Sequence, residues 1–150
     1  MNIRIVDNRR ETLAGVLADT LPHAREALLA VAFVKTTGLR LIEKALGKTL
    51  AQGGRAEFIV GLDFHQTDAE VLRTLSGMKK DGVSLFCYGD PARPAPRLFH
   101  PKLYLVAGDE TVTAVVGSSN LTEGGLEKNV EVNVLVEDLA TAELISDLYG

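Results

Sequence analysis

Residues 27–34 read Ala-Leu-Leu-Ala-Val-Ala-Phe-Val, an apolar run typical of strands that are buried on both faces of a sheet. A short apolar run alone fits either a strand or a buried helix, so the flanking sequence decides between them. Residues 36–46 carry apolar side chains at helical spacing, and Gly53-Gly54 suit a helix exit. Residues 58–62 form the next apolar run. The order strand, helix, strand predicts a parallel pair joined by a helical crossover.

The same alternation extends in both directions from this unit. Before it, residues 3–6 predict a short strand and residues 11–21 a helix, for which Asp7-Asn8 supply capping groups. After it, residues 68–80 predict a helix and residues 83–88 a strand. Strands that alternate with helices of this length imply right-handed crossovers and a largely parallel sheet sandwiched between helices.

The pattern changes in the last third of the chain. Three strands are predicted over 102–107, 111–116 and 130–136 with short loops between them, which indicates antiparallel pairing at one side of the sheet. A closing helix is predicted over 139–148. The expected fold class is therefore α/β, one domain over residues 1–150 with a mixed, largely parallel sheet between helices.

The composition is that of an ordinary globular chain. Of its 150 residues, 46% are hydrophobic and 24% charged, which is too apolar for disorder. The net charge is -4, so any phosphate site must come from a local cluster of basic groups. The single cysteine, Cys87, lies in an apolar run and is expected to be a buried, inert thiol.

Neither a membrane partner nor secretion is indicated. The N-terminus carries no long apolar stretch, and no window approaches the length of a membrane span, which favours a cytoplasmic protein. The chain stops at Tyr149-Gly150 directly after a helical pattern. That abrupt end suggests a piece of a longer protein that carries other domains.

Polar residues that could take part in catalysis or binding gather near three predicted strand ends. His100 and Lys102 stand two positions apart, so in a strand their side chains share a face. Residues 117–120, Gly-Ser-Ser-Asn, follow a strand and present backbone N–H groups, hydroxyls and an amide that suit a phosphate. Glu131 lies in the last predicted strand, where a carboxylate needs a partner. The imidazole of His100 is the expected partner.

These residues resemble the phospholipase D superfamily, whose signature is a His-x-Lys pair, an Asp and then a Gly-Ser-x-Asn turn. The matching positions are His100, Lys102, Gly117, Ser118 and Asn120. Ala107 stands where the family has its Asp. One branch, the metal-independent restriction endonucleases, omits the Asp and uses a later Asn and Glu. Asn120 follows His100 by 20 positions and Glu131 follows Asn120 by 11, which is similar to the spacing in that branch.

The resemblance implies a metal-independent phosphodiesterase that needs no cofactor and acts on DNA. It implies that His100 attacks phosphorus to form a phosphohistidine and that a second His100 serves as acid and base. Lys102 and Asn120, assisted by Ser118 and with less weight by Ser119, would bind the phosphate oxygens. Glu131 would orient the His100 ring. Because the chain holds one His-x-Lys pair, the resemblance implies a homodimer.

Two other functions remain open at this stage. One is an inactive module that binds DNA and dimerises within a restriction or helicase protein, which the loss of the family's acidic residue at Ala107 would fit. The other is a phospholipid-hydrolysing enzyme, which lacks support from any basic, membrane-seeking helix. Arg93 and Arg97 precede His100 in a Pro-rich loop, where they are either solvated or in contact with the DNA backbone.

Overall fold

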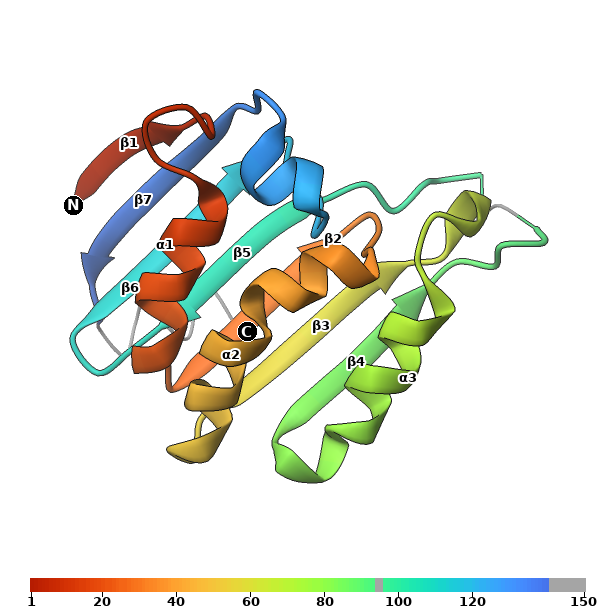
Figure 1. Ribbon diagram of the computed structural model, residues 1–150, viewed down its shortest axis with the longest axis horizontal. Helices are drawn as coiled ribbons and strands as arrows, with labels where there is room; N and C mark the ends of the chain where they lie inside the picture. The colour runs from red at the N-terminus through yellow and green to blue at the C-terminus, as the bar shows by residue number, and fades with distance from the viewer. Residues whose placement is uncertain (94–95, 141–150) are drawn as a thin grey trace.

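The computed structural model describes residues 1–93 and 96–140, which form one mixed sheet with helices packed against it (Figure 1). The described residues contribute seven strands, in the order β1-β7-β6-β5-β2-β3-β4. The strands are β1 (Asn2–Val6), β2 (Glu26–Val31), β3 (Arg55–Gly61), β4 (Val83–Tyr88), β5 (Lys102–Ala107), β6 (Thr111–Gly117) and β7 (Asn133–Leu139). The α/β fold class with a mixed sheet is confirmed. The helix predicted over 139–148 lies almost wholly outside the described residues, and position 139 itself ends β7.

Parallel pairing is less extensive than the sequence led us to expect. Only β2 with β3 and β3 with β4 pair in parallel, and these are the strands joined by helical crossovers. The other four pairs between described strands are antiparallel. Two of these, β5·β6 and β6·β7, join strands that are consecutive in the chain, whereas β1·β7 and β2·β5 bring together segments far apart in sequence. The expectation of a largely parallel sheet is therefore wrong, because four of the six pairs between described strands are antiparallel.

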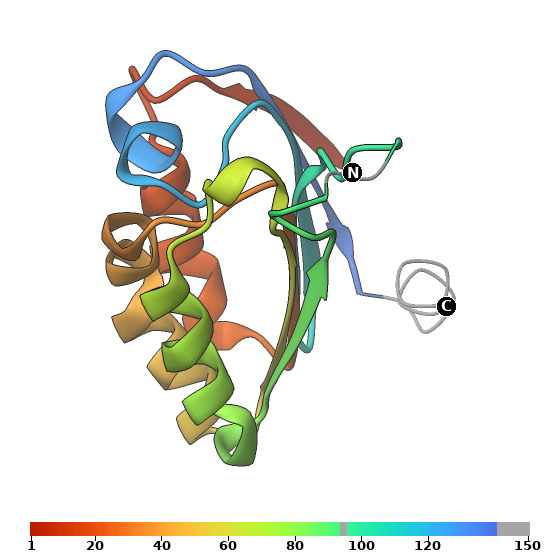
Figure 2. The same ribbon diagram turned by 90° about the vertical axis from the view of Figure 1, so that its right-hand side faces the viewer.

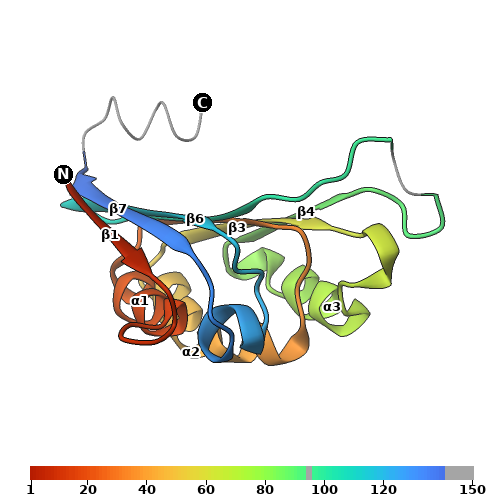
Figure 3. The same cartoon turned by 90° about the horizontal axis from the view of Figure 1, so that it is seen from above.

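The helices of the described residues all lie on one face of the sheet (Figures 2 and 3). They include α1 (Leu13–Thr20), α2 (Thr36–Ala51) and α3 (Ala69–Gly77), together with the short helices η1 (Leu21–His23), η2 (Asp63–His65), η3 (Lys79–Asp81) and η4 (Gly124–Lys128). Between these helices and the sheet lies the main core, with Leu29, Phe58 and Leu135 fully buried. No helix in the described part of the chain is long and apolar enough to cross a membrane.

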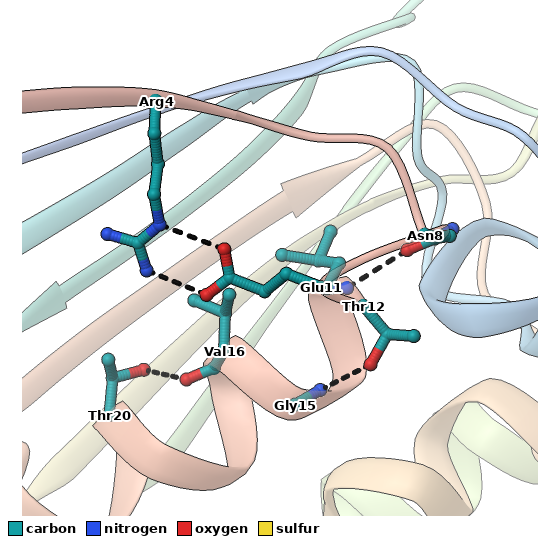
Figure 4. Close-up of polar contacts among 8 residues, drawn as sticks. Arg4, Asn8, Glu11, Thr12, Gly15, Val16 and Thr20 are labelled. Atoms are coloured by element: carbon teal, nitrogen blue, oxygen red, sulfur yellow. Dashed lines mark hydrogen bonds and ion pairs between the residues drawn. The ribbon is translucent and has the colours of Figure 1, made fainter.

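The junction between β1 and α1 is held by several polar contacts (Figure 4). The helix begins at Leu13, later than predicted, because the Thr12 hydroxyl caps it by accepting a backbone N–H of the first turn. Asn8 adds to the cap, since its side-chain oxygen accepts the Leu13 N–H at 3.0 Å. Arg4 forms two hydrogen bonds with the Glu11 carboxylate, at 2.9 and 2.8 Å. Strand β1 is thus tied to the helix layer.

Cys87 is exposed, contrary to the prediction of a buried thiol. It lies in β4, which is the edge strand of the sheet, and residues 86–88 are all exposed. Partial desolvation still raises the pKa of the Cys87 thiol. An apolar run such as residues 83–88 fits an edge strand as readily as a central one, so the sequence does not show which strand is covered.

Candidate active site

Three chain segments with the predicted site residues meet at one edge of the sheet. Strand β5 begins there at Lys102, β6 ends there at Gly117, and β7 begins there at Asn133. The antiparallel registers pair Leu103 with Val116 and Gly117 with Asn133, so the three ends lie side by side. The site residues therefore come from neighbouring ends of antiparallel strands.

Lys102 contacts His100, but the contact is to the backbone of the histidine and not to its ring. The Lys102 ammonium donates to the His100 carbonyl oxygen at 3.0 Å, and the His100 side chain is exposed. Lys102 itself is buried, with 9% of its surface exposed. Burial lowers the pKa of the Lys102 ammonium from its usual value, and the negative charge of Glu131 opposes that shift. The arrangement offers an accessible imidazole beside a partly desolvated cation.

Glu131 does not lie within a strand, because β7 starts two residues later. Its half-buried carboxylate accepts a hydrogen bond from the Ser118 hydroxyl, and the Asn129 side-chain amide donates to it at 3.4 Å. Ser118 in turn accepts the Val132 N–H at 3.0 Å. The hydrogen bonds found for Glu131 within the described ranges do not include one to His100. The predicted pairing of Glu131 with His100 in one chain is thus wrong, and Ser118 is the partner.

Ser119 lies beneath the site. It is fully buried, and its hydroxyl accepts from the Asn133 side-chain amide at 2.9 Å. Its carbonyl oxygen accepts from the Tyr104 hydroxyl at 2.9 Å. Burial, together with the negative charge of Glu131, raises the pKa of the Tyr104 hydroxyl. Contrary to the sequence expectation, Ser119 supports the turn from inside rather than facing a phosphate.

Gly117 is required by close packing. A Cβ at this position would lie 2.3 Å from the Val132 carbonyl oxygen and 2.6 Å from the Asn133 Cα. The entry of β7 therefore runs directly against the glycine. The sequence assigned Gly117 to a tight turn, whereas the structure assigns it to the close approach of two backbones.

Asn120 is held from the other half of the sheet. Its side-chain oxygen accepts the backbone N–H of Phe33 at 3.3 Å, just beyond the end of β2. This contact orients the amide so that its nitrogen can donate to a substrate oxygen. Sequence reasoning did not identify Phe33 or Tyr104 as supports, because contacts through buried or backbone groups leave no recognisable motif.

Arg93 and Arg97 are both exposed in the segment between β4 and His100. The backbone N–H of Arg93 donates to the Asp90 carbonyl oxygen at 3.1 Å, which closes a turn in this segment. The structure thus places two guanidinium groups on the chain that leads into the site. Their contact with the phosphate backbone of a bound DNA remains a prediction.

The chain is similar to known proteins in sequence pattern and in fold. A family model described as the phospholipase D-like domain of cardiolipin synthase matches residues 17–149. No curated protein sequence matches the chain.

Solved structures with the same fold include NucT from Helicobacter pylori, with a TM-score of 0.67 and 17% identity over 99% of this chain and 91% of that one. The phospholipase D family member Nuc from Salmonella typhimurium has a TM-score of 0.66 and 18% identity, over 99% of this chain and 89% of that one. A phosphatidylserine synthase from Haemophilus influenzae has a TM-score of 0.69 and 13% identity, over 98% of this chain and 37% of that one. At these identities the likenesses show the fold.

Proposed function

Because the chain belongs to the phospholipase D superfamily, we propose that it is a phosphodiesterase that cleaves DNA without a metal ion. The observation that carries the proposal is the gathering of His100, Lys102, Ser118, Asn120 and Glu131 at one sheet edge. These groups provide an accessible nucleophile and donors for phosphate oxygens. With an Asn and a Glu and without the usual Asp, the set is similar to that of the metal-independent nuclease branch.

The reaction proceeds in two displacements. In the first, a ring nitrogen of one His100 bonds to phosphorus, and the bond from phosphorus to the leaving oxygen breaks. A second His100 gives its proton to that oxygen. In the next step the second His100 takes a proton from water, the water oxygen bonds to phosphorus, and the bond between phosphorus and nitrogen breaks. Lys102 and the amide of Asn120 hold the nonbridging oxygens while negative charge develops on them.

Glu131 acts on its surroundings in two ways. Its carboxylate holds the Ser118 hydroxyl at the mouth of the turn, and its charge lies close enough to Lys102 to favour the ammonium form. Since Glu131 is not bonded to His100 in one chain, we propose that it receives the ring N–H of His100 from the second chain of a dimer. That contact would set which ring nitrogen attacks.

The dimer rests on two features. One chain supplies a single His-x-Lys pair, whereas the two displacements use two histidines. An exposed aliphatic group of Ile5, Val116, Val132 and Val134 lies on β1, β6 and β7 and directly before β7, next to the strand ends that form the site. Exposed apolar side chains that cluster in this way are typical of protein interfaces. A symmetric pairing through them would place the second chain next to Ser118 and Glu131.

A mixing experiment tests the shared site. Wild-type chains are equilibrated with His100→Ala chains under conditions that allow exchange, and cleavage is followed against the mixing ratio. If only a pair of intact chains is fully active, activity falls as the square of the wild-type fraction. A fall in simple proportion to that fraction would show that each chain works alone. Chains with Val116→Asp should not join the exchange and should be inactive.

Two functions compete with the proposal, and chelation separates them. We expect the protein to cut DNA in the presence of EDTA, because its donors are nitrogen and hydroxyl groups that act on the phosphate directly. Binding of DNA without cleavage would favour the inactive module. Release of headgroups from phospholipid vesicles without DNA cleavage would favour a lipase. Cleavage that strictly requires magnesium would contradict the mechanism.

A further inference from the structure

Three aromatic side chains lie on β4 and on the segment that leads from β4 to the candidate nucleophile. Phe86 and Tyr88 stand two positions apart in β4, so their side chains lie on the same face of the sheet. The rings of Tyr88 and Phe99 are stacked, with centroids 5.1 Å apart and planes at 28°. His100 follows Phe99 directly in the chain. We call Phe86, Tyr88 and Phe99 the aromatic track.

The track lies on the face of the sheet away from the described helices. Val83 and Leu85, which alternate with Phe86 and Tyr88, pack against the core on the helix face. The segment from residue 96 into β5 also lies on the side of the sheet opposite the helices (Figure 3). Phe86 is 55% exposed and Tyr88 is 44% exposed, which is unusual for side chains of this size. One face of the Tyr88 ring lies against Phe99, and the exposed remainder of Tyr88 and Phe86 is accessible to a ligand.

The neighbouring strand leaves room for the stack. Gly61 of β3 pairs with Tyr88, so no side chain stands beside the tyrosine ring on that side. A Cβ on Gly61 would lie 2.3 Å from the Ala32 carbonyl oxygen and 3.4 Å from the Phe99 carbonyl oxygen, so Phe99 lies near this glycine. The chain that leads to His100 thus passes near the end of β3. The aromatic track extends from the edge strand β4 to Phe99, the residue before His100.

We propose that the aromatic track stacks the bases of a single-stranded nucleic acid and feeds its backbone to His100. The proposal rests on the phosphodiesterase function above and adds the strand preference and the residues that set it. Aromatic rings in sequence are the usual platform for unpaired bases, because every base has a π-face, whereas bases in a duplex are stacked on one another and shielded. The exposed Arg93 and Arg97 lie in the part of the chain between β4 and Phe99.

The position of the track favours bases over other occupants. The exposed aliphatic group proposed for the dimer belongs to β1, β6 and β7, whereas the track lies at the opposite edge of the sheet, on β4. A strand whose phosphate reaches His100 has its neighbouring bases within reach of Phe99 and then Tyr88.

The test measures binding and cleavage separately. Binding of a labelled oligothymidylate is followed by fluorescence anisotropy for wild type, Phe86→Leu and Tyr88→Leu, with an abasic strand of equal length and a duplex as comparison ligands. Hydrolysis of bis(4-nitrophenyl) phosphate in EDTA reports the chemistry without bases. Tyr88→Phe, which keeps the ring, and Ile3→Ala, which trims a different exposed side chain, serve as controls, and circular dichroism checks the fold.

Each leucine variant is expected to weaken binding of the single strand about tenfold, as loss of one base–aromatic stack does. Binding of the abasic strand and hydrolysis of the small diester should stay unchanged, as should all properties of the two controls. The track would be overturned if the leucine variants bound the abasic strand as much more weakly as the normal strand, or if they bound both strands as wild type does. A loss of vesicle binding or of dimerisation in place of strand binding would also overturn it. If wild type binds the single strand through the track but does not hydrolyse the small diester, the track stands and the proposed function fails.

Discussion

Replacement of His100 with alanine is expected to lower cleavage of phosphodiesters by at least about 10⁴-fold, as loss of a covalent nucleophile does. The alanine removes both the atom that bonds to phosphorus and, in the second chain, the proton donor. Because the His100 side chain is exposed, the fold should not depend on it. Single-turnover cleavage of a labelled oligonucleotide in EDTA, together with the thermal unfolding midpoint, measures both effects.

The chain contains its own control for this experiment. His23 is also exposed, but it lies in η1, beside Gly108 at the opposite end of the sheet. His23→Ala should retain full activity. Added imidazole should restore part of the activity of His100→Ala, since it supplies the missing ring. Residual activity within tenfold of wild type in His100→Ala would mean that the histidine does not attack phosphorus.

Replacement of Lys102 with methionine is expected to lower kcat/KM about 10²- to 10³-fold, which is the usual cost of one donor to a developing oxyanion. Methionine keeps the apolar stem that is buried at the start of β5. Since the ammonium of Lys102 is partly desolvated, its removal should not lower the unfolding midpoint. A variant with full activity, or one that is inactive only because it unfolds, would contradict the assigned role.

The pH dependence follows from the same desolvation. Burial lowers the pKa of the Lys102 ammonium, and only the charged form stabilises the phosphate oxygens. On raising the pH, wild-type kcat/KM should therefore begin to fall below the pH at which an ordinary lysine loses its proton. Lys102→Arg stays charged throughout, so whatever activity it retains should lack this alkaline limb. The same alkaline limb in both proteins would assign it to another group.

The strands and helices of the first half could be predicted because each of them is a local pattern. The apolar run at residues 27–34 and its crossover helix were identified, and β4 was predicted with its observed bounds. Which strands become neighbours was harder, since β2 pairs with β5 and β1 with β7. Such pairs are decided by the packing of the whole sheet, and no local pattern marks them.

The candidate site was predictable in its membership and not in its contacts. The motif grouped His100, Lys102, Ser118 and Asn120, and the strand ends next to these residues are neighbours in the sheet. Glu131 was placed in a strand because residues 130–136 alternate, whereas β7 starts at Asn133. Of the two serines, the sequence did not reveal that Ser119 is the buried one, because the backbone turns after Gly117 and the strand alternation ends there.

The support beneath the site also has a consequence for the order of assembly. The Asn133 amide that holds Ser119 also donates to the carbonyl oxygen of Val6, 127 positions earlier in the chain. The segment up to Asn133 must therefore have left the ribosome before this contact with Val6 can form. Contacts between such distant residues close late in folding. A truncated chain without β1 or β7 would carry the histidine and the lysine but would lack one of the contacts that hold Ser119 in the turn after β6.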